Sequence, residues 1–220
     1  MKQKLVCVFA HPDDEAFGPG GTIAKFTKDY EVYILCATRG EAGEKNGEHD
    51  IGKTRSNELL ESSRILGVKK VFFLGFTDGQ LCNSIYHDLA KKIIRIVKRL
   101  KPEVLLTFEP RGVSGHIDHV TVSMVTAYVF EHLSFVKKIL YYCHTDWQVK
   151  IIKTFLRDYF VYFPPGYKSS EIALTVDITP VWKIKEKAMK IHKSQIHDVN
   201  RILTFLKLMP KKEYFLVLKK

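Results

Sequence analysis

The chain has 220 residues, 45% of them hydrophobic and 27% charged, which is ordinary for a folded domain that buries most of its apolar surface. We therefore expect residues 1–220 to form a single domain. The formal net charge is +11, but the lysines are scattered over expected helix faces, which favours a solvated basic surface over specific nucleic-acid binding. An acidic substrate and non-specific polyanion binding are the alternatives that the charge leaves open.

The chain lacks the apolar patterns that target or anchor a protein. Residues 1–4 do not resemble a signal peptide, and the most apolar long stretch, 120–135, is too short to cross a bilayer and contains Glu131. The four cysteines form no Cys-x-x-Cys motif and are expected to be reduced thiols, packed as small hydrophobic groups. These patterns predict a cytoplasmic protein without a membrane span.

The first 133 residues alternate between strand-like and helix-like segments. Alternation of this kind is typical of βαβ units, in which a parallel sheet is covered by helices on both faces. We therefore predict an α/β fold whose first four strands take the order 3-2-1-4. Short apolar runs place these strands at 4–10, 31–38, 70–75 and 103–108, and helical spacing of apolar residues places the helices at 20–28, 53–66, 86–100 and 118–133.

After residue 133 the pattern is less regular. Strands are expected at 138–144, 158–163 and 172–178, and the segment 214–218 fits either a last strand or a helix. An amphipathic helix is expected over 181–197.

Two clusters of polar residues follow the first and fourth predicted strands. His-Pro-Asp-Asp-Glu occupies 11–15, and Ser-Gly-His-Ile-Asp-His occupies 114–119. In the predicted strand order these two strands are neighbours, and the order of the strands reverses between them. The clusters should therefore meet at this switch point, at the carboxyl ends of the two strands. A catalytic zinc ion takes three protein ligands, and His11, Asp14 and His119 would supply two imidazoles and one carboxylate. The nearby candidates left for acid, base or supporting roles are Asp13, Glu15, His116 and Asp118.

Other motifs carry weaker signals. The glycines of 18–21 lack a nucleotide-binding spacing and are interpreted as allowing tight packing between helix and strand. Arg55 and Glu58, one helical turn apart, fit either a surface ion pair or an arginine that points into the cleft. His192 is expected to face solvent, and a role for Asp78 at the mouth of the cleft is not indicated.

At this point the chain resembles the LmbE-like family, also called the PIG-L family, of zinc-dependent N-deacetylases. The matching motifs occur in the family's order: Ala10-His11-Pro12-Asp13-Asp14-Glu15, Thr38-Arg39-Gly40-Glu41, Arg55-x-x-Glu58, Gly115-His116-Ile117-Asp118-His119 and His192-x-Ser194-Gln195. The resemblance implies a Rossmann-like three-layer sandwich, mostly parallel with strand order 3-2-1-4-5 and a less regular C-terminal part. It also implies removal of an acetyl group from a small N-acetylglucosaminyl substrate.

Roles for individual residues follow from the resemblance by position. His11, Asp14 and His119 look like the zinc ligands, Asp13 like the general base, and Arg55 like a substrate-binding arginine. Protonated His116 looks like the residue that stabilises the oxyanion. Glu15 and Asp118 look like supporting residues that orient the histidines. Either His116 or Asp13 could protonate the leaving amine.

Several alternatives stay open at this stage. A related zinc amidase would share the site and act on a larger acyl group or a thiol conjugate, and a catalytically silent sugar- or polyanion-binding protein would keep only the fold. Two imidazoles and one carboxylate also accept iron, cobalt or manganese. Members of the family are often oligomers, so the resemblance is also compatible with a homo-oligomer.

Overall fold

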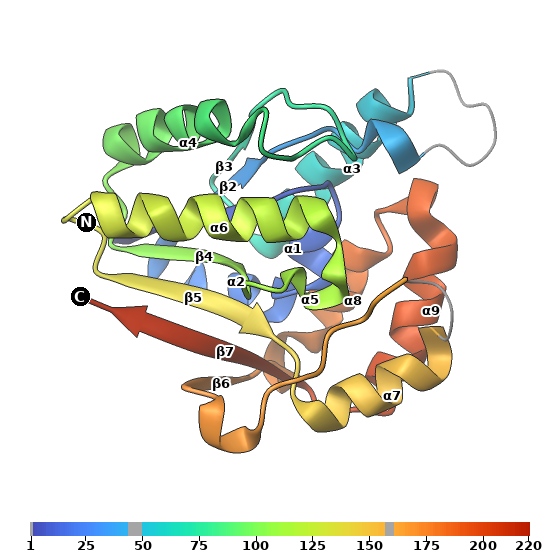
Figure 1. The fold of residues 1–220 in the computed structure, drawn as a ribbon. Helices are drawn as coiled ribbons and strands as arrows, with labels where there is room; N and C mark the ends of the chain where they lie inside the picture. Colours follow the sequence, from blue (N-terminus) through green and yellow to red (C-terminus); the bar gives the residue numbers. More distant parts are fainter. Residues whose placement is uncertain (1, 44–49, 157–160) are drawn as a thin grey trace.

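A computed structural model describes residues 2–43, 50–156 and 161–220, and its framework is a seven-stranded sheet with order β3-β2-β1-β4-β5-β7-β6 (Figure 1). The pairs from β3 to β5 are parallel, and β7 pairs antiparallel with both β5 and β6. The predicted order 3-2-1-4-5 is therefore confirmed. The strands are β1 (Gln3–Phe9), β2 (Tyr30–Cys36), β3 (Lys70–Phe73), β4 (Val104–Phe108), β5 (Lys138–Cys143), β6 (Leu174–Asp177) and β7 (Lys212–Lys219).

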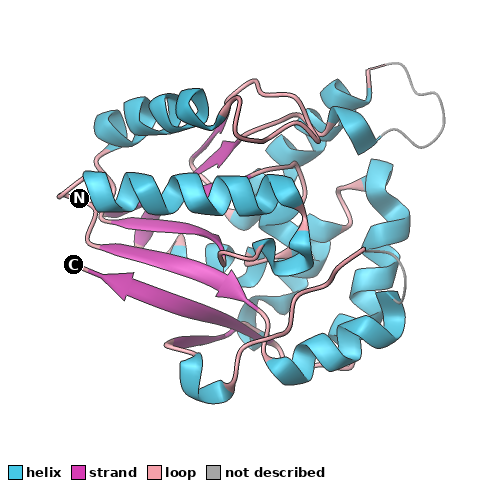
Figure 2. Cartoon of the chain, in the orientation of Figure 1, coloured by secondary structure: helices cyan, strands magenta, loops and turns pink. Residues whose placement is uncertain are grey.

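Helices cover both faces of this sheet, which gives the predicted three layers (Figure 2). One face packs against α4 and α6, and the other packs against α2, α3, α8 and α9. Side chains of β1 alternate between the two cores, since Val6 and Val8 face the first and Leu5 and Cys7 face the second. The helices are α1 (Asp14–Phe17), α2 (Gly20–Phe26), α3 (Ile51–Leu66), α4 (Tyr86–Leu100), α5 (Gly112–Gly115), α6 (Ile117–His132), α7 (Asp146–Leu156), α8 (Trp182–Met189) and α9 (Ile196–Lys207).

The C-terminal third departs from the sequence prediction in two places. The helix expected over 181–197 is broken: α8 ends at Met189, a short 3-10 turn covers Lys193–Gln195, and α9 begins at Ile196. Of the strand expected over 158–163, residues 157–160 lie outside the described part, and 161–163 form no strand. The last segment is a strand, because β7 fills the gap between β5 and β6.

The structure also bears on three smaller expectations. Cys7, Cys36 and Cys143 are buried free thiols, whereas Cys82 is exposed. A side chain at Gly21 would collide with Ile178, so this glycine does allow close packing of α2. Within the described ranges, no helix has both the length and the apolar character needed to cross a membrane.

A buried ion pair ties the C-terminal strand to the loop that follows the first polar cluster. Lys185 on α8 donates to the Glu213 carboxylate at 2.7 Å and to the Gly18 carbonyl at 2.6 Å, and both charged side chains are 2% exposed. The same carboxylate accepts from the backbone amides of Gly21 and Thr22 at the start of α2. Glu213 therefore holds α8, α2 and the end of α1 in one arrangement.

Replacing Glu213 by alanine should cost about 3–5 kcal/mol of the free energy of unfolding, because it leaves the Lys185 ammonium buried without its counter-charge. Urea denaturation measures this loss. The matched control is Glu186→Ala, which removes an exposed pair with Lys190 and should cost about 0–1 kcal/mol. Equal losses in the two variants would contradict the structural role of Glu213.

Candidate metal centre

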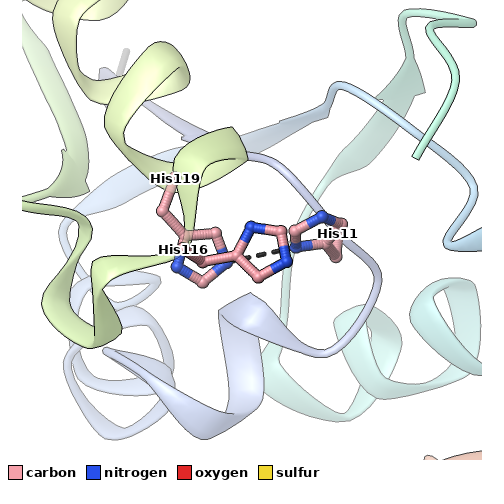
Figure 3. A group of neighbouring side chains, drawn as sticks. All are labelled: His11, His116 and His119. Carbon is pink, nitrogen blue, oxygen red and sulfur yellow. Dashed lines mark hydrogen bonds between the residues drawn. The ribbon is translucent and has the colours of Figure 1, made fainter. Parts of the chain in front are cut away.

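The two polar clusters meet at the carboxyl edge of β1 and β4. His11 follows β1 directly, and His119 lies in the first turn of α6; these two histidines lie side by side with His116 (Figure 3). The Nδ1 atom of His11 is 3.1 Å from Nε2 of His119. His11 and His119 form a triangle with Asp14, whose Oδ1 lies 3.2 Å from Nε2 of His119 and whose Oδ2 lies 3.8 Å from Nδ1 of His11.

The two shorter separations are close to those expected between ligand atoms of one metal ion. Ligand atoms bound tetrahedrally to zinc at 2.0–2.1 Å lie about 3.3 Å from one another. Two imidazoles and a carboxylate also form the kind of donor set that catalytic zinc sites use, with a fourth position left for solvent or substrate. His116 is close enough to belong to the same group, since nitrogen atoms of His11, His116 and His119 all lie within 4.8 Å of one another.

Hydrogen bonds hold each of the three side chains in the orientation that an ion requires. The Nδ1 atom of His119 donates to the carbonyl of Gly112 at 3.0 Å, which leaves Nε2 free to bind a metal. The Asp14 Oδ2 atom accepts from the amides of Ala10 and His11, so Oδ1 is left facing His119. Burial would raise the pKa of Asp14, but the charges and hydrogen bonds of the two histidines outweigh it and lower the pKa.

His11 is oriented by two carboxylates on its far side. Its Nε2 atom lies 2.9 Å from Asp78 and 3.2 Å from Asp118. Burial alone would lower the pKa of His11, but the carboxylates of Asp118, Asp78 and Asp14 raise it to about 10. Carboxylates that hold one ring nitrogen leave the other directed at a metal.

His11, Asp78 and Asp118 are themselves close enough to hold an ion, but their hydrogen bonds favour a supporting role. The Asp118 carboxylate already accepts from the amides of Gly79 at 2.8 Å and Leu81 at 3.1 Å. Asp78 accepts from the amide of Ala42 at 3.1 Å. Both carboxylates are thus engaged by backbone N–H groups, which leaves them as acceptors for His11.

Asp13 lies beside this group in a strained backbone conformation. Its φ is 115°, and its amide donates to Glu15 Oε2 at 3.0 Å. The Asp13 carboxylate accepts from Arg55 at 2.9 Å, and the side chain is 13% exposed. Burial is the main reason that the pKa of Asp13 rises to about 6. The positive charge of Arg55 opposes this rise, and the negative charge of Asp14 adds to it. A carboxyl group of this kind can exchange a proton near neutral pH.

Arg55 is buried and lies at the cleft, so the alternative of a surface pair with Glu58 is wrong. Its guanidinium donates to the carbonyls of Gly40 and Pro12, each at 2.9 Å, as well as to Asp13. Gly40 has φ of +74°, and any side chain there would collide with the guanidinium. Glu58 instead accepts from Ser194.

Glu15 is fully buried and fixes the backbone of Asp13 by accepting a hydrogen bond from its amide. Besides the Asp13 amide, its carboxylate accepts from Ser62 Oγ at 2.5 Å and lies 2.9 Å from Nε2 of His192. The prediction that His192 faces solvent is therefore wrong, because its side chain is fully buried. Helical spacing could not reveal this, since the expected helix breaks just before His192.

His116 caps the N-terminus of α6, and this contact favours the neutral ring over the protonated form predicted from the sequence. Its Nδ1 atom accepts from the Asp118 amide at 3.2 Å, so the single proton of a neutral ring lies on Nε2. Burial, and then the charges of His11 and His119, lower the pKa of His116. The Asp118 carboxylate is directed at His11.

Sequence reasoning missed two further acidic residues. Asp78 follows β3 in a loop, where it gave only a turn signal. Glu109, 2% exposed at the end of β4, accepts from the amides of Arg111 and Val113 and from the Tyr167 hydroxyl. It thereby shapes the turn whose Gly112 carbonyl orients His119. A lone carboxylate directly after a buried strand was the available signal for Glu109.

The geometry defines an α/β protein with a group of side chains that could hold a metal ion at the switch point of its sheet, and the comparisons give its family. Residues 6–130 match the family model described as PIG-L, GlcNAc-PI de-N-acetylase, and the chain belongs to this family.

Two curated relatives carry deacetylase names. A 1D-myo-inositol 2-acetamido-2-deoxy-alpha-D-glucopyranoside deacetylase of Rhodococcus jostii is 32% identical over 157 residues, which is 59% of this chain and 54% of that protein. The match thus spans about half the length of this relative. A diacetylchitobiose deacetylase of Thermococcus kodakarensis is 28% identical over 203 residues, 89% of this chain and 71% of that protein.

Solved structures show the same fold. An N,N'-diacetylchitobiose deacetylase from Pyrococcus horikoshii has a TM-score of 0.74 at 24% identity, covering 99% of this chain and 84% of that one. The 4-carboxy-2-hydroxymuconate hydratase GalB of Pseudomonas putida has a TM-score of 0.73 at 18% identity, covering 100% and 97%. Because one neighbour is named a deacetylase and the other a hydratase, the fold alone does not decide the reaction.

Replacing Asp78 by alanine should weaken zinc binding about 10- to 100-fold, because His11 loses a carboxylate that holds its far nitrogen. Competition with a chromogenic chelator measures the dissociation constant. Asp88→Ala, which removes an exposed carboxylate paired with Lys91, is the control and should leave the affinity unchanged. An unchanged affinity in both variants would show that Asp78 does not orient His11.

Proposed function

We propose that this chain is a metal-dependent deacetylase that removes the N-acetyl group from an N-acetylglucosamine-containing small molecule. The family and the names of the two curated relatives support the reaction and the substrate class. The observation that carries the proposal is the triangle of His11, Asp14 and His119 beside the buried carboxyl group of Asp13. We also propose that residues 1–220 act as one domain, since strands from both ends of the chain share one sheet.

We propose that His11, Asp14 and His119 hold the metal through Nδ1, a carboxylate oxygen and Nε2. Two nitrogens and one oxygen suit zinc, although iron, cobalt and manganese bind the same donors. When bound, such an ion supplies Lewis acidity and hydroxide at neutral pH. A cavity of about 370 Å³ lies against all three ligands and also against Asp13, giving a substrate access to them.

Asp13 is the proposed general base. Arg55 fixes one of its oxygens, and Glu15 fixes its backbone through the amide, so the carboxylate has little freedom to turn away from the cavity. It accepts the proton of the attacking water and then returns it to the nitrogen of the leaving amine. We assign this second transfer to Asp13 rather than to His116. The neutral ring of His116 carries a single proton, and that proton is needed for the hydrogen bond to the carbonyl oxygen.

His116 is the proposed donor to the oxygen of the acetamide carbonyl. With Nδ1 accepting from the backbone, its Nε2–H is the donor available as negative charge develops on that oxygen. Arg55 lies at the cavity, but its terminal nitrogens already donate to three acceptors. We therefore propose that it positions Asp13; direct substrate binding by Arg55 stays a prediction.

The test of the function is a screen for acetate release from N-acetylglucosaminides with different aglycones. We expect release by the zinc-loaded protein, loss of at least 90% of the rate after chelation, and recovery when zinc is restored. A silent binding protein would release no acetate, and an amidase for larger acyl groups would release bulkier acids faster than acetate. Either result would contradict the proposed reaction.

Asp13→Asn should retain one zinc ion per chain and lose at least 100-fold in kcat, because the amide cannot accept the proton of water. Metal analysis and steady-state kinetics measure the two quantities on the same sample. Asp29→Asn, a change in an exposed residue outside the cavity, is the control. Full activity of the zinc-loaded Asp13 variant would remove this residue from the mechanism.

A further inference from the structure

The cavity beside the proposed metal ligands has two chemically different sides. The polar side carries Asp13, Arg55 and Asp78, together with Ala42 and Gly43. The opposite side carries mostly aromatic and aliphatic groups, which are Phe108, Tyr142, Ile152, Leu156, Ile202 and Phe205.

The sheet order separates these two sides. Strands β2 and β3 lie to one side of β1, and their following loops supply Ala42, Gly43 and Asp78. Strands β4 and β5 lie to the other side; Phe108 ends β4, Tyr142 lies near the end of β5, and α7 follows in the chain (Figure 1). The proposed metal ligands follow β1 and β4, so the metal would lie between the polar side and the apolar side.

The apolar side begins at the metal ligands and continues to α7 and α9. The ring of Phe108 lies 4.8 Å from that of His119, and the ring of Tyr142 lies 6.0 Å from that of Phe108. Beyond them, Ile152 of α7 and Phe205 of α9 belong to a small hydrophobic cluster of their own. Ile202 packs against both this cluster and the core that contains Phe108 and Tyr142, so the apolar lining is continuous from one to the other.

The polar residues that line this end are Tyr142, His144, Asp198 and Arg201. His144 lies 5.4 Å from Tyr142, ring to ring, and its buried Nδ1 has no hydrogen-bond partner among the described residues. Burial, with a smaller effect of the Lys185 charge, lowers the pKa of His144 to about 4, so the ring is neutral at pH 7. The charged lining residues of α9, Asp198 and Arg201, lie one helical turn before its apolar ones.

We infer that the substrate carries an apolar group of several carbons close to the scissile amide, and that this group binds between α7 and α9. The inference rests on the proposed function, because it takes the amide carbonyl to lie at His11, Asp14 and His119. The sugar hydroxyls then face the polar side, and water is excluded from the apolar side by the bound group. The group is attached through the anomeric oxygen, as an alkyl aglycone, because the acyl group removed in the proposed function is acetyl.

The test compares three substrates: the methyl and hexyl β-glycosides of N-acetylglucosamine, and methyl N-hexanoyl-β-glucosaminide. Each fully buried methylene strengthens binding about fourfold, so partial burial of a hexyl chain should raise kcat/KM at least about tenfold over the methyl glycoside. A gain for the hexyl glycoside supports the aglycone site, whereas a gain for the hexanoyl amide alone would contradict both this attachment and the proposed removal of acetyl. No gain for either overturns the inference while acetate release still supports the proposed function.

Two variants test whether the higher kcat/KM of the hexyl glycoside depends on the apolar side of the cavity. Leu156→Asn places a polar amide on the apolar side and should reduce the ratio of hexyl to methyl kcat/KM at least about threefold. Leu208→Asn, at the end of α9, changes a 63% exposed leucine that does not line the cavity, and it should leave the ratio unchanged. Equal ratios in both variants and the parent protein would place the apolar site elsewhere and overturn the inference.

Binding measured by calorimetry keeps the two proposals separate. If none of the substrates is hydrolysed, the proposed function fails, but the hexyl glycoside should still bind at least about tenfold more tightly than the methyl glycoside. Equal affinities would overturn the apolar site by themselves.

Discussion

The parallel pairing of β1 with β4 is the constraint on which the site depends. It aligns Leu5 with Val104 and Cys7 with Leu106, and so brings the residues after each strand to the same edge of the sheet. A shift of two residues would keep the same side chains in each core but move one strand about 6.6 Å along the other. His11 and His119, now 3.1 Å apart between ring nitrogens, could then no longer share an ion.

Burial of so many carboxylates at one edge is costly unless each has its own partners, and the backbone supplies most of them. Asp14, Asp118 and Glu15 all accept from main-chain amides, and these bonds fix where their remaining oxygens point. Some of these amides belong to distant parts of the chain, such as the loop of Gly79. The orientation of the proposed metal ligands is therefore a property of the whole fold.

The fold sets the place of the chemistry, and side chains set its kind. A hydratase shares this architecture at a TM-score of 0.73, so the sheet and its switch point are compatible with more than one reaction. In this chain the donor set and the neighbouring carboxyl group of Asp13 favour hydrolysis at a metal. The unequal sides of the cavity then concern which substrate is accepted, because they arise from loops and helices on opposite sides of β1.

The sequence by itself determined the alternation of strands and helices and the neighbouring places of the two polar clusters, and it predicts that His11, Asp14 and His119 bind the metal. Those features depend on local periodicity and on a topological rule. The tertiary structure alone decided that Asp78 supports His11, that Glu109 shapes the turn before His119 and that His192 is buried against Glu15. Glu15 and His192 are 177 positions apart, and no local pattern encodes such a contact, because its hydrogen bond forms only when α1 and the segment after α8 pack together.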